Sequence, residues 1–133
     1  MLSLNQKKSC PKRSTEVNKT MNDTFELNLG CVVYSEALNG IEAQYIFKRD
    51  DIIQRGTGIG KRLSKLNKNR RFEGEFEVVY ADENGDMSPT LHLTILFDSE
   101  CYSLTWKIGS EITDIGIGIK NDNKLFVSYQ KTT

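Results

Sequence analysis

The chain has 133 residues, of which 38% are hydrophobic and 27% charged. That length suits one domain and suffices to bury a hydrophobic core without disulfides or metals. Lysine plus arginine equals aspartate plus glutamate at 18 each, so no overall charge draws the molecule to nucleic acid or to an anionic membrane.

Three cysteines, Cys10, Cys31 and Cys101, are an odd number at wide spacings. This pattern indicates neither a disulfide framework nor a CxxC metal site, and we expect Cys31 and Cys101 to be small hydrophobic residues that are buried or nearly buried. We find no apolar run that matches a signal peptide or a transmembrane helix. The sequence therefore predicts a cytoplasmic protein with reduced thiols and no membrane partner.

Residues 1–24 are polar, contain Pro11 and have more basic than acidic side chains. Such a composition predicts a disordered basic tail. Met21 stands just before the first strand-like segment, which makes it a candidate for the true start of the protein.

From Phe25 onward, hydrophobic residues recur with a period close to two, and aromatic and β-branched residues are frequent, which indicates strands. The clearest segment is FEGEFEVVYAD, in which Phe72, Phe76, Val78 and Tyr80 share one face and three glutamates share the other. In chain order, the expected strands are FELNLGCVVY, IEAQYIF, DIIQRGTGI, FEGEFEVVYAD, TLHLTILF, CYSLTWKI, EITDIGIGI and KLFVSYQ.

Most connections between these eight segments are too short for a crossover helix, so sequential strands must be antiparallel neighbours. We predict an all-β fold over residues 25–133, an eight-stranded up-and-down barrel of the lipocalin or avidin kind, because closure leaves no exposed edge. The connector Gly60–Arg71 is the exception in length, and it is open whether it forms a turn or two of helix or an irregular loop.

The stretch QRGTGIGKRLS, residues 54–64, resembles a phosphate-binding loop but fails its requirements. In a GxxxxGK[ST] loop, Arg55 would have to be glycine and Arg62 would have to be serine or threonine. A GxGxxG dinucleotide motif would need glycine at Lys61 and a following βαβ unit. We therefore predict a structural role for these glycines.

An internal repeat supports that interpretation. IIQRGTGI matches ITDIGIGI sixty residues later, with Gly56 and Gly58 aligned to Gly116 and Gly118 and no lysine in the same place after the second copy. Alternate glycines clear one face of a strand, which permits a sharp bend or close packing against bare backbone. The chain thus reads as two pseudo-repeats, residues 25–60 and 72–130.

Four segments of the second half, GEFEVVY, YSLTW, DIGIGI and KLFVSY, resemble a group of poorly characterised bacterial β-barrel domains. In that group a G-x-Y/F-x-V strand precedes Y-x-L-x-W, G-x-G and L-x-V-x-Y elements, and some members are labelled fibronectin-binding. The first half resembles the segment that follows the L-x-V-x-Y strand. The resemblance covers Phe25 to Tyr129 and implies a small barrel, with no catalytic residue to transfer.

Four aromatic residues, Tyr45, Tyr80, Tyr102 and Trp106, fall on apolar strand faces and would point into a closed barrel. An eight-stranded barrel is wide enough either to be filled by such side chains or to keep one small ligand. Both outcomes remain open: a packed core, or an apolar pocket with aromatic walls.

Titratable residues outside the aromatic set give weaker signals. His92 lies between two leucines on the face opposite the apolar stripe, so we expect it to be solvated, and a lone imidazole does not make a metal site. Acidic residues are expected near turns, with no two of them placed in a cleft: Asp50, Asp51, Glu111 and Asp114.

A run of basic residues without acidic neighbours occupies the connector. It consists of Lys61, Arg62, Lys65, Lys68, Arg70 and Arg71. Such a run suits phosphate contacts, but it lacks interleaved aromatic residues on which bases would stack, so a solvated surface is the favoured reading over nucleic acid.

The sequence as a whole predicts a non-catalytic binding module whose barrel holds a small apolar or amphipathic molecule or contacts a protein partner, with no cofactor. Two alternatives stay open. One is a small-barrel enzyme, an isomerase or hydrolase that uses inward acids as bases. The other is an accessory protein that contacts nucleic acid through the basic connector.

Overall fold

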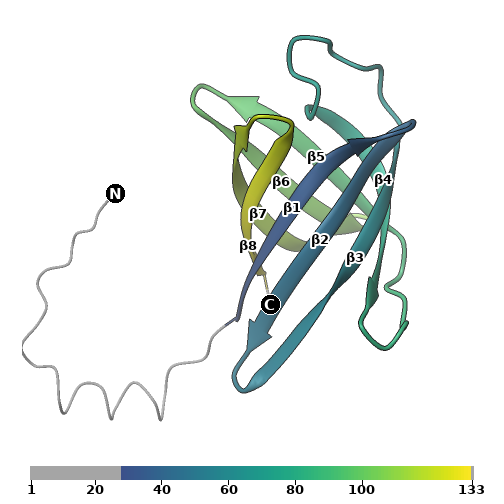
Figure 1. The fold of residues 1–133 in the computed structure, drawn as a ribbon, viewed down its shortest axis with the longest axis vertical. Helices are drawn as coiled ribbons and strands as arrows, with labels where there is room; N and C mark the ends of the chain where they lie inside the picture. The colour runs from purple at the N-terminus through teal and green to yellow at the C-terminus, as the bar shows by residue number, and fades with distance from the viewer. Residues whose placement is uncertain (1–27, 133) are drawn as a thin grey trace, which may run out of the picture.

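The computed structural model describes residues 28–132, so the predicted tail 1–24 lies outside the described residues. Eight antiparallel strands form one closed barrel, in which each strand pairs with its sequence neighbours and β1 pairs with β8 (Figure 1). The predicted all-β, eight-stranded up-and-down barrel is confirmed. The strands are β1 (Asn28–Ala37), β2 (Gly40–Arg49), β3 (Ile52–Arg62), β4 (Gly74–Asp82), β5 (Leu91–Asp98), β6 (Cys101–Ile108), β7 (Glu111–Asn121) and β8 (Lys124–Lys131).

The described residues form no helix, so none of them belongs to a helix able to cross a membrane. The barrel interior holds one hydrophobic core built from alternate residues of its strands. Phe76, Leu93, Ile95 and Leu125 are completely inaccessible to solvent. Their strand neighbours point outward, which is the period-two pattern seen in the sequence.

The connector closes one end of the barrel. β3 runs on to Arg62, and residues 63–73 then form an irregular loop without helix. The Arg62 guanidinium donates to the Glu73 carbonyl (2.9 Å) and the Arg71 carbonyl (2.5 Å), and its carbon lies 4.6 Å from the centre of the Phe76 ring. Phe72 lies in this loop rather than in a strand, yet it is buried on the predicted side.

At the opposite end, the wall between β4 and β5 is incomplete. Pairing of these two strands stops at Val78 and Leu91, although β4 continues beside β3 to Asp82. The following loop, residues 83–90, supplies the missing partners. Ser88 N–H donates to the Tyr80 carbonyl (2.7 Å), and Tyr80 N–H donates to Ser88 Oγ (2.9 Å). The loop thereby satisfies backbone groups that a strand would otherwise satisfy.

The glycines of β3 lie in the barrel wall and no helix follows them, as expected for a structural role. Gly58 faces inward, and a Cβ there would lie 2.4 Å from Cδ1 of Tyr80. A Cβ on Gly56 would lie 1.9 Å from the carbonyl oxygen of Ala81 on the next strand. The missing side chains therefore allow close approach of a ring and of neighbouring backbone.

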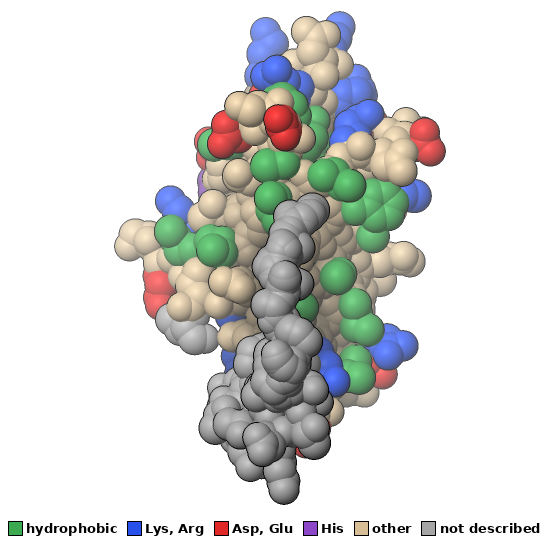
Figure 2. All heavy atoms as spheres, turned by 90° about the vertical axis from the view of Figure 1, so that its left-hand side faces the viewer, with side chains coloured by type: hydrophobic (Ala, Val, Ile, Leu, Met, Phe, Trp, Pro, Cys, Tyr) green, Lys and Arg blue, Asp and Glu red, His purple; other side chains and the backbone are tan. Residues whose placement is uncertain are grey.

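The second glycine-containing strand, β7, has its large side chains on the outside of the barrel. On β7, Gly116 and Gly118 face inward, while Ile115, Ile117 and Ile119 are exposed. Apolar side chains are visible among polar ones on the face of the barrel turned toward the viewer in Figure 2.

The prediction for Cys31 was wrong. This residue falls on the outward side of β1, next to the buried Val32, and is exposed. Cys101, at the first position of β6, is partly exposed, so it too is not fully buried. Both cysteines lie on the outward side of their strands, which determines their exposure. A small hydrophobic residue near a strand end does not by itself show whether it points inward or outward.

Gly58→Ala should destabilise the barrel by about 1–3 kcal/mol, because the new methyl group must displace the Tyr80 ring. Gly109→Asn is the matched control: Gly109 has φ +62°, which asparagine tolerates, and open space around it. That variant should change the free energy of unfolding by less than about 0.5 kcal/mol. Urea denaturation measures both, and an unchanged midpoint for Gly58→Ala would contradict the packing described.

Candidate functional site

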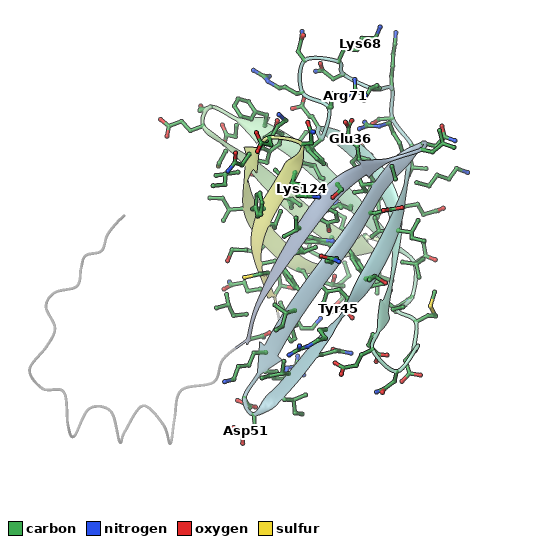
Figure 3. The ribbon with its side chains drawn as sticks, viewed as in Figure 1. Glu36, Tyr45, Asp51, Lys68, Arg71 and Lys124 are labelled. Carbon is green, nitrogen blue, oxygen red and sulfur yellow. The ribbon has the colours of Figure 1, made fainter. Side chains whose placement is uncertain are left out.

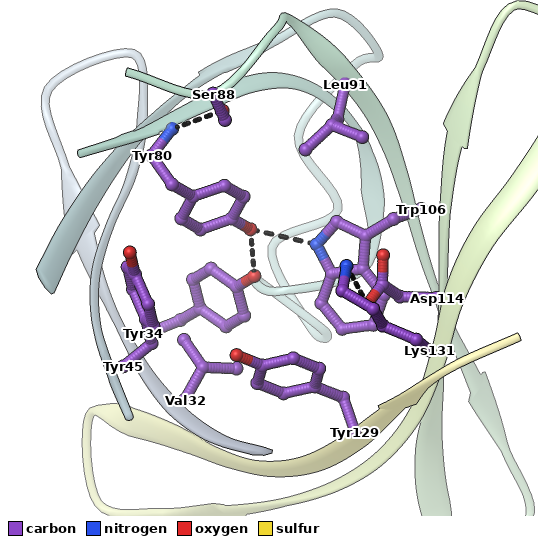
Figure 4. A pocket seen from close by; sticks show the side chains of 10 residues that line it. All are labelled: Val32, Tyr34, Tyr45, Tyr80, Ser88, Leu91, Trp106, Asp114, Tyr129 and Lys131. Atoms are coloured by element: carbon purple, nitrogen blue, oxygen red, sulfur yellow. Dashed lines mark hydrogen bonds and ion pairs between the residues drawn. The ribbon is translucent and has the colours of Figure 1, made fainter. Parts of the chain in front are cut away.

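A cavity of about 150 Å³ lies inside the barrel at the end where β4 and β5 separate (Figure 4). Every strand except β3 contributes a lining side chain, and the loop 83–90 contributes one more. The lining residues are Val32, Tyr34, Tyr45, Tyr80, Ser88, Leu91, Trp106, Asp114, Tyr129 and Lys131. Because β3 presents Gly58 rather than a side chain there, the Tyr80 ring can pack directly against that part of the wall.

Three aromatic side chains share a hydrogen-bonded chain in the cavity (Figure 4). Trp106 Nε1–H donates to Tyr80 Oη at 2.8 Å, and Tyr34 Oη lies 2.6 Å from Tyr80 Oη. Tyr34 and Trp106 are 1% and 3% exposed, so the chain is anchored in the core. Buried aromatic side chains with polar atoms place directional groups in an otherwise apolar space.

Two further tyrosines complete the aromatic wall. The Tyr45 ring meets the Tyr80 ring edge to face, with centroids 5.8 Å apart. The Tyr129 ring lies between Phe47 and Trp106, at 5.8 Å and 5.6 Å. Their hydroxyls form no hydrogen bond with any other residue in the described range 28–132, so both remain available to a bound molecule.

A buried carboxylate faces the same cavity. Asp114 is 9% exposed, and one of its oxygens lies 3.6 Å from the ammonium of Lys131. Asp114 lies opposite the inward-facing Trp106, on the same side of β7 as Gly116 and Gly118. A bulge lies next to it, since β6 and β7 shift register between Trp106 and Lys107 and leave Thr113 unpaired. Bulges are common beside functional sites.

Burial controls the ionisation of the cavity tyrosines. It raises the pKa of Tyr80 to about 12, an effect that hydrogen bonds from Tyr34 and Trp106 partly offset. Burial also raises the pKa of Tyr34 well above its usual value, and it raises the pKa of Tyr129, to which the nearby Asp114 charge adds. At neutral pH the cavity therefore presents protonated hydroxyls, which are hydrogen-bond donors as well as acceptors.

The structure brings three of the four predicted aromatic residues to the cavity: Tyr45, Tyr80 and Trp106. Tyr102 is buried elsewhere and packs against Phe97 with ring centroids 5.1 Å apart. Sequence reasoning missed Tyr34 and Tyr129, although their signal was present. Tyr34 lies two residues after the buried Val32, and Tyr129 lies two residues after the buried Val127. Each tyrosine is therefore on the inward face of its strand.

Asp114 was predicted to lie near a turn, and it lies inside the barrel, where it lines the cavity as the one acid of the four to do so among the described residues. Asp114 alternates along β7 with the inward-facing Gly116 and Gly118, so the sequence pattern could have placed it inside the barrel. The other three acids, Asp50, Asp51 and Glu111, are exposed, and they lie at or beside turns as predicted. Asp51 is labelled at its turn in Figure 3. His92 lies outside the barrel and pairs with Glu75 at 2.7 Å.

The basic connector is partly engaged within the molecule. Arg71 forms an ion pair with Glu36 at 2.7 Å, at the barrel end opposite Asp51 (Figure 3). Arg70 stacks on Phe97 at 4.4 Å. Arg62 is held by the loop carbonyls. Within residues 28–132, the three exposed lysines of the connector, Lys61, Lys65 and Lys68, form no ion pair or side-chain hydrogen bond. In the described part of the chain, no three histidine, cysteine or acidic residues cluster in a way that would hold a metal ion.

Comparison of the chain with protein-family models, curated proteins and solved structures gives no match.

The free energy of unfolding should fall as pH rises above about 10. Below that pH, tyrosines are protonated in both states; above it, the unfolded chain loses protons first because burial holds the folded pKa values higher. Urea denaturation at a series of pH values measures the slope. Tyr80→Phe should make the slope shallower between pH 10 and about 12, and an identical slope would contradict this assignment.

Proposed function

We propose that this chain is a non-catalytic binding module whose barrel holds a small amphipathic molecule. The observation that carries the proposal is the cavity of about 150 Å³, walled by five aromatic side chains and containing polar groups at defined points. Ligand sites are typically concave and mostly apolar, with a few convergent polar groups. The other end of the barrel, by contrast, is filled by Phe72, Phe76 and the connector.

The chemistry of the wall favours an amphipathic occupant over a purely apolar one. Ring faces and Leu91 suit an apolar body, whereas the tyrosine hydroxyls and the Asp114–Lys131 pair suit polar substituents. Lys131 is 39% exposed in its side chain, which puts this pair near the rim. A bound molecule would thus place its apolar part among the rings and a polar group toward the hydroxyls or the rim.

Three finer statements belong to the same proposal. The binding mode would be lipocalin-like, with the ligand inside the barrel and not on its surface. The resemblance to bacterial barrel domains suggests a bacterial relative of that group, acting in the cytoplasm. Contact with a protein partner is the variant of this function, for which the exposed isoleucines of β7 offer an apolar surface.

Filling the cavity should abolish binding. Native mass spectrometry of the full chain purified from its own host should show a small-molecule adduct, and delipidation with organic solvent should shift the fluorescence of Trp106, which lines the cavity. In Leu91→Phe the larger ring occupies ligand space, so the adduct should be reduced at least tenfold.

Leu96→Phe is the matched control, since Leu96 lies on the same strand but is 54% exposed on the outer wall. It should retain the adduct. A wild-type chain without an adduct, and without a Trp106 response to any compound in a library of small amphipathic molecules, would contradict the proposal.

The cavity also supports a second candidate, an isomerase-like enzyme. The buried carboxylate of Asp114 and the Tyr34–Tyr80 hydroxyls line one space, which is the arrangement of a base facing hydrogen-bond donors. The ion pair with Lys131 occupies that carboxylate, and so binding remains the preferred function. Nucleic-acid contact has less support, because Arg62, Arg70 and Arg71 already have partners within the chain.

Proton exchange discriminates the two candidates. For a binding module, the wild-type chain should not accelerate the exchange of α-hydrogens of cyclohexanone with deuterium from heavy water, as followed by NMR. Acceleration that disappears in Asp114→Asn, with the Trp106 fluorescence response to cyclohexanone retained, would instead establish the enzyme. Acceleration that persists in Asp114→Asn would exclude Asp114 as the base.

A further inference from the structure

The hydrogen-bonded chain of Trp106, Tyr80 and Tyr34 has one more donor hydrogen than there are hydrogen bonds within it. Trp106 N–H, Tyr80 O–H and Tyr34 O–H bring three hydrogens, because a phenol is protonated at neutral pH and burial raises both pKa values further. Within residues 28–132, hydrogen bonds join Trp106 to Tyr80 at 2.8 Å and Tyr34 to Tyr80 at 2.6 Å. Each contact takes one hydrogen.

The surplus remains whichever way the phenols are oriented. If Tyr34 donates to Tyr80, the hydrogen of Tyr80 is left over; if Tyr80 donates, the hydrogen of Tyr34 is left over. Within residues 28–132, no other side chain or carbonyl lies within hydrogen-bond distance of either oxygen. One hydroxyl hydrogen therefore points to an acceptor that these residues do not supply.

An unmet donor in a buried place is costly, so an acceptor from outside the described residues has a strong advantage there. Water can serve in the free protein, and a ligand oxygen that replaces this water keeps the hydrogen bond. Tyr34 is 1% exposed and lines the cavity, so the acceptor must come from whatever occupies the cavity.

The size and charge of the cavity narrow the chemical class of the ligand further. A cavity of about 150 Å³ matches the size of engineered apolar cavities that bind benzene, so one ring with a short substituent fits. The only positive charge in the lining, Lys131, is already paired with Asp114. An anionic oxygen would lack a free counter-charge, and a neutral oxygen needs none.

We propose, building on the binding function above, that the ligand is a neutral single-ring compound with a carbonyl oxygen, which accepts the surplus hydrogen of the Tyr34–Tyr80 pair. The ring then lies among Tyr45, Trp106 and Tyr129, whose faces form the cavity wall. The carbonyl points to the buried hydroxyls, which leaves the other end of the ring toward the Asp114–Lys131 rim.

Acetophenone and ethylbenzene form a matched pair of probes, in which the carbonyl of the first replaces a methylene of the second. Both should shift Trp106 fluorescence in the full chain. The carbonyl of acetophenone loses hydrogen bonds to water on entry, so a cavity without a donor would prefer ethylbenzene. We expect acetophenone to bind at least as tightly, and a preference of tenfold or more for ethylbenzene would overturn the inference.

The infrared C=O stretch of bound acetophenone gives a direct readout. It should lie at or below its frequency in water, since the phenol donates to it, and the double variant Tyr34→Phe/Tyr80→Phe should move it toward its frequency in hydrocarbon solvent. Tyr102→Phe is the control, because Tyr102 is buried outside the cavity. A frequency unchanged in the double variant, or raised by this control, would overturn the assignment.

The outcomes separate this inference from the binding function. If both compounds bind and the C=O stretch has its hydrocarbon value, the ligand class is wrong and the binding barrel stands. If neither compound binds and native mass spectrometry shows no adduct, both proposals fall. A low stretch frequency that depends on Tyr34 and Tyr80 supports both.

Discussion

The site depends on a steric constraint: two of its rings occupy space that a side chain on the neighbouring strand would fill. The Tyr80 ring occupies the space that a Cβ on Gly58 would need, and the Tyr129 ring occupies the space of a Cβ on Gly30, which would lie 2.3 Å from the ring. In an eight-stranded barrel the interior is only wide enough for side chains to fill it. Gly58 and Gly30 are thus the condition for Tyr80 and Tyr129 on the strands beside them, and they let these two rings line the cavity.

Two departures from regular strand pairing then make the interior a site instead of a uniform core. The β4–β5 pairing ends early at Val78, and the loop with Ser88 takes over the backbone hydrogen bonds of Tyr80. A bulge lies next to the inward-facing Asp114, opposite Trp106. Both departures border the cavity, whereas the opposite end has regular pairing up to the connector. The irregularities are therefore concentrated where the polar groups are.

The sequence predicted the fold well because its main signal, alternation, is local. In FEGEFEVVYAD and TLHLTILF the alternate hydrophobic residues face the barrel interior, as the sequence pattern indicates. Short turns then make each strand the neighbour of the next. The site was predicted only in part. Tyr45, Tyr80 and Trp106 could be placed inside by parity, but which rings share one end depends on strand register, and the structure places Tyr102 away from the cavity. Asp114 could likewise have been placed inside by its parity with Gly116 and Gly118. Ser88 depended on a break in strand pairing, which has no periodic signature.

The contrast between the two ends also bears on whether the cavity is merely a flaw in packing. An apolar filling, such as Phe72 and Phe76 provide at the connector end, would suit stability better than a buried acid–lysine pair and linked phenols. Polar groups inside a small barrel cost desolvation energy unless partners compensate it. Here compensation is incomplete within the described residues, since the Tyr34–Tyr80 pair keeps a spare hydrogen and the hydroxyls of Tyr45 and Tyr129 lack partners. A molecule bound in the cavity would supply those partners, and this accounts for a polar interior that packing alone does not require.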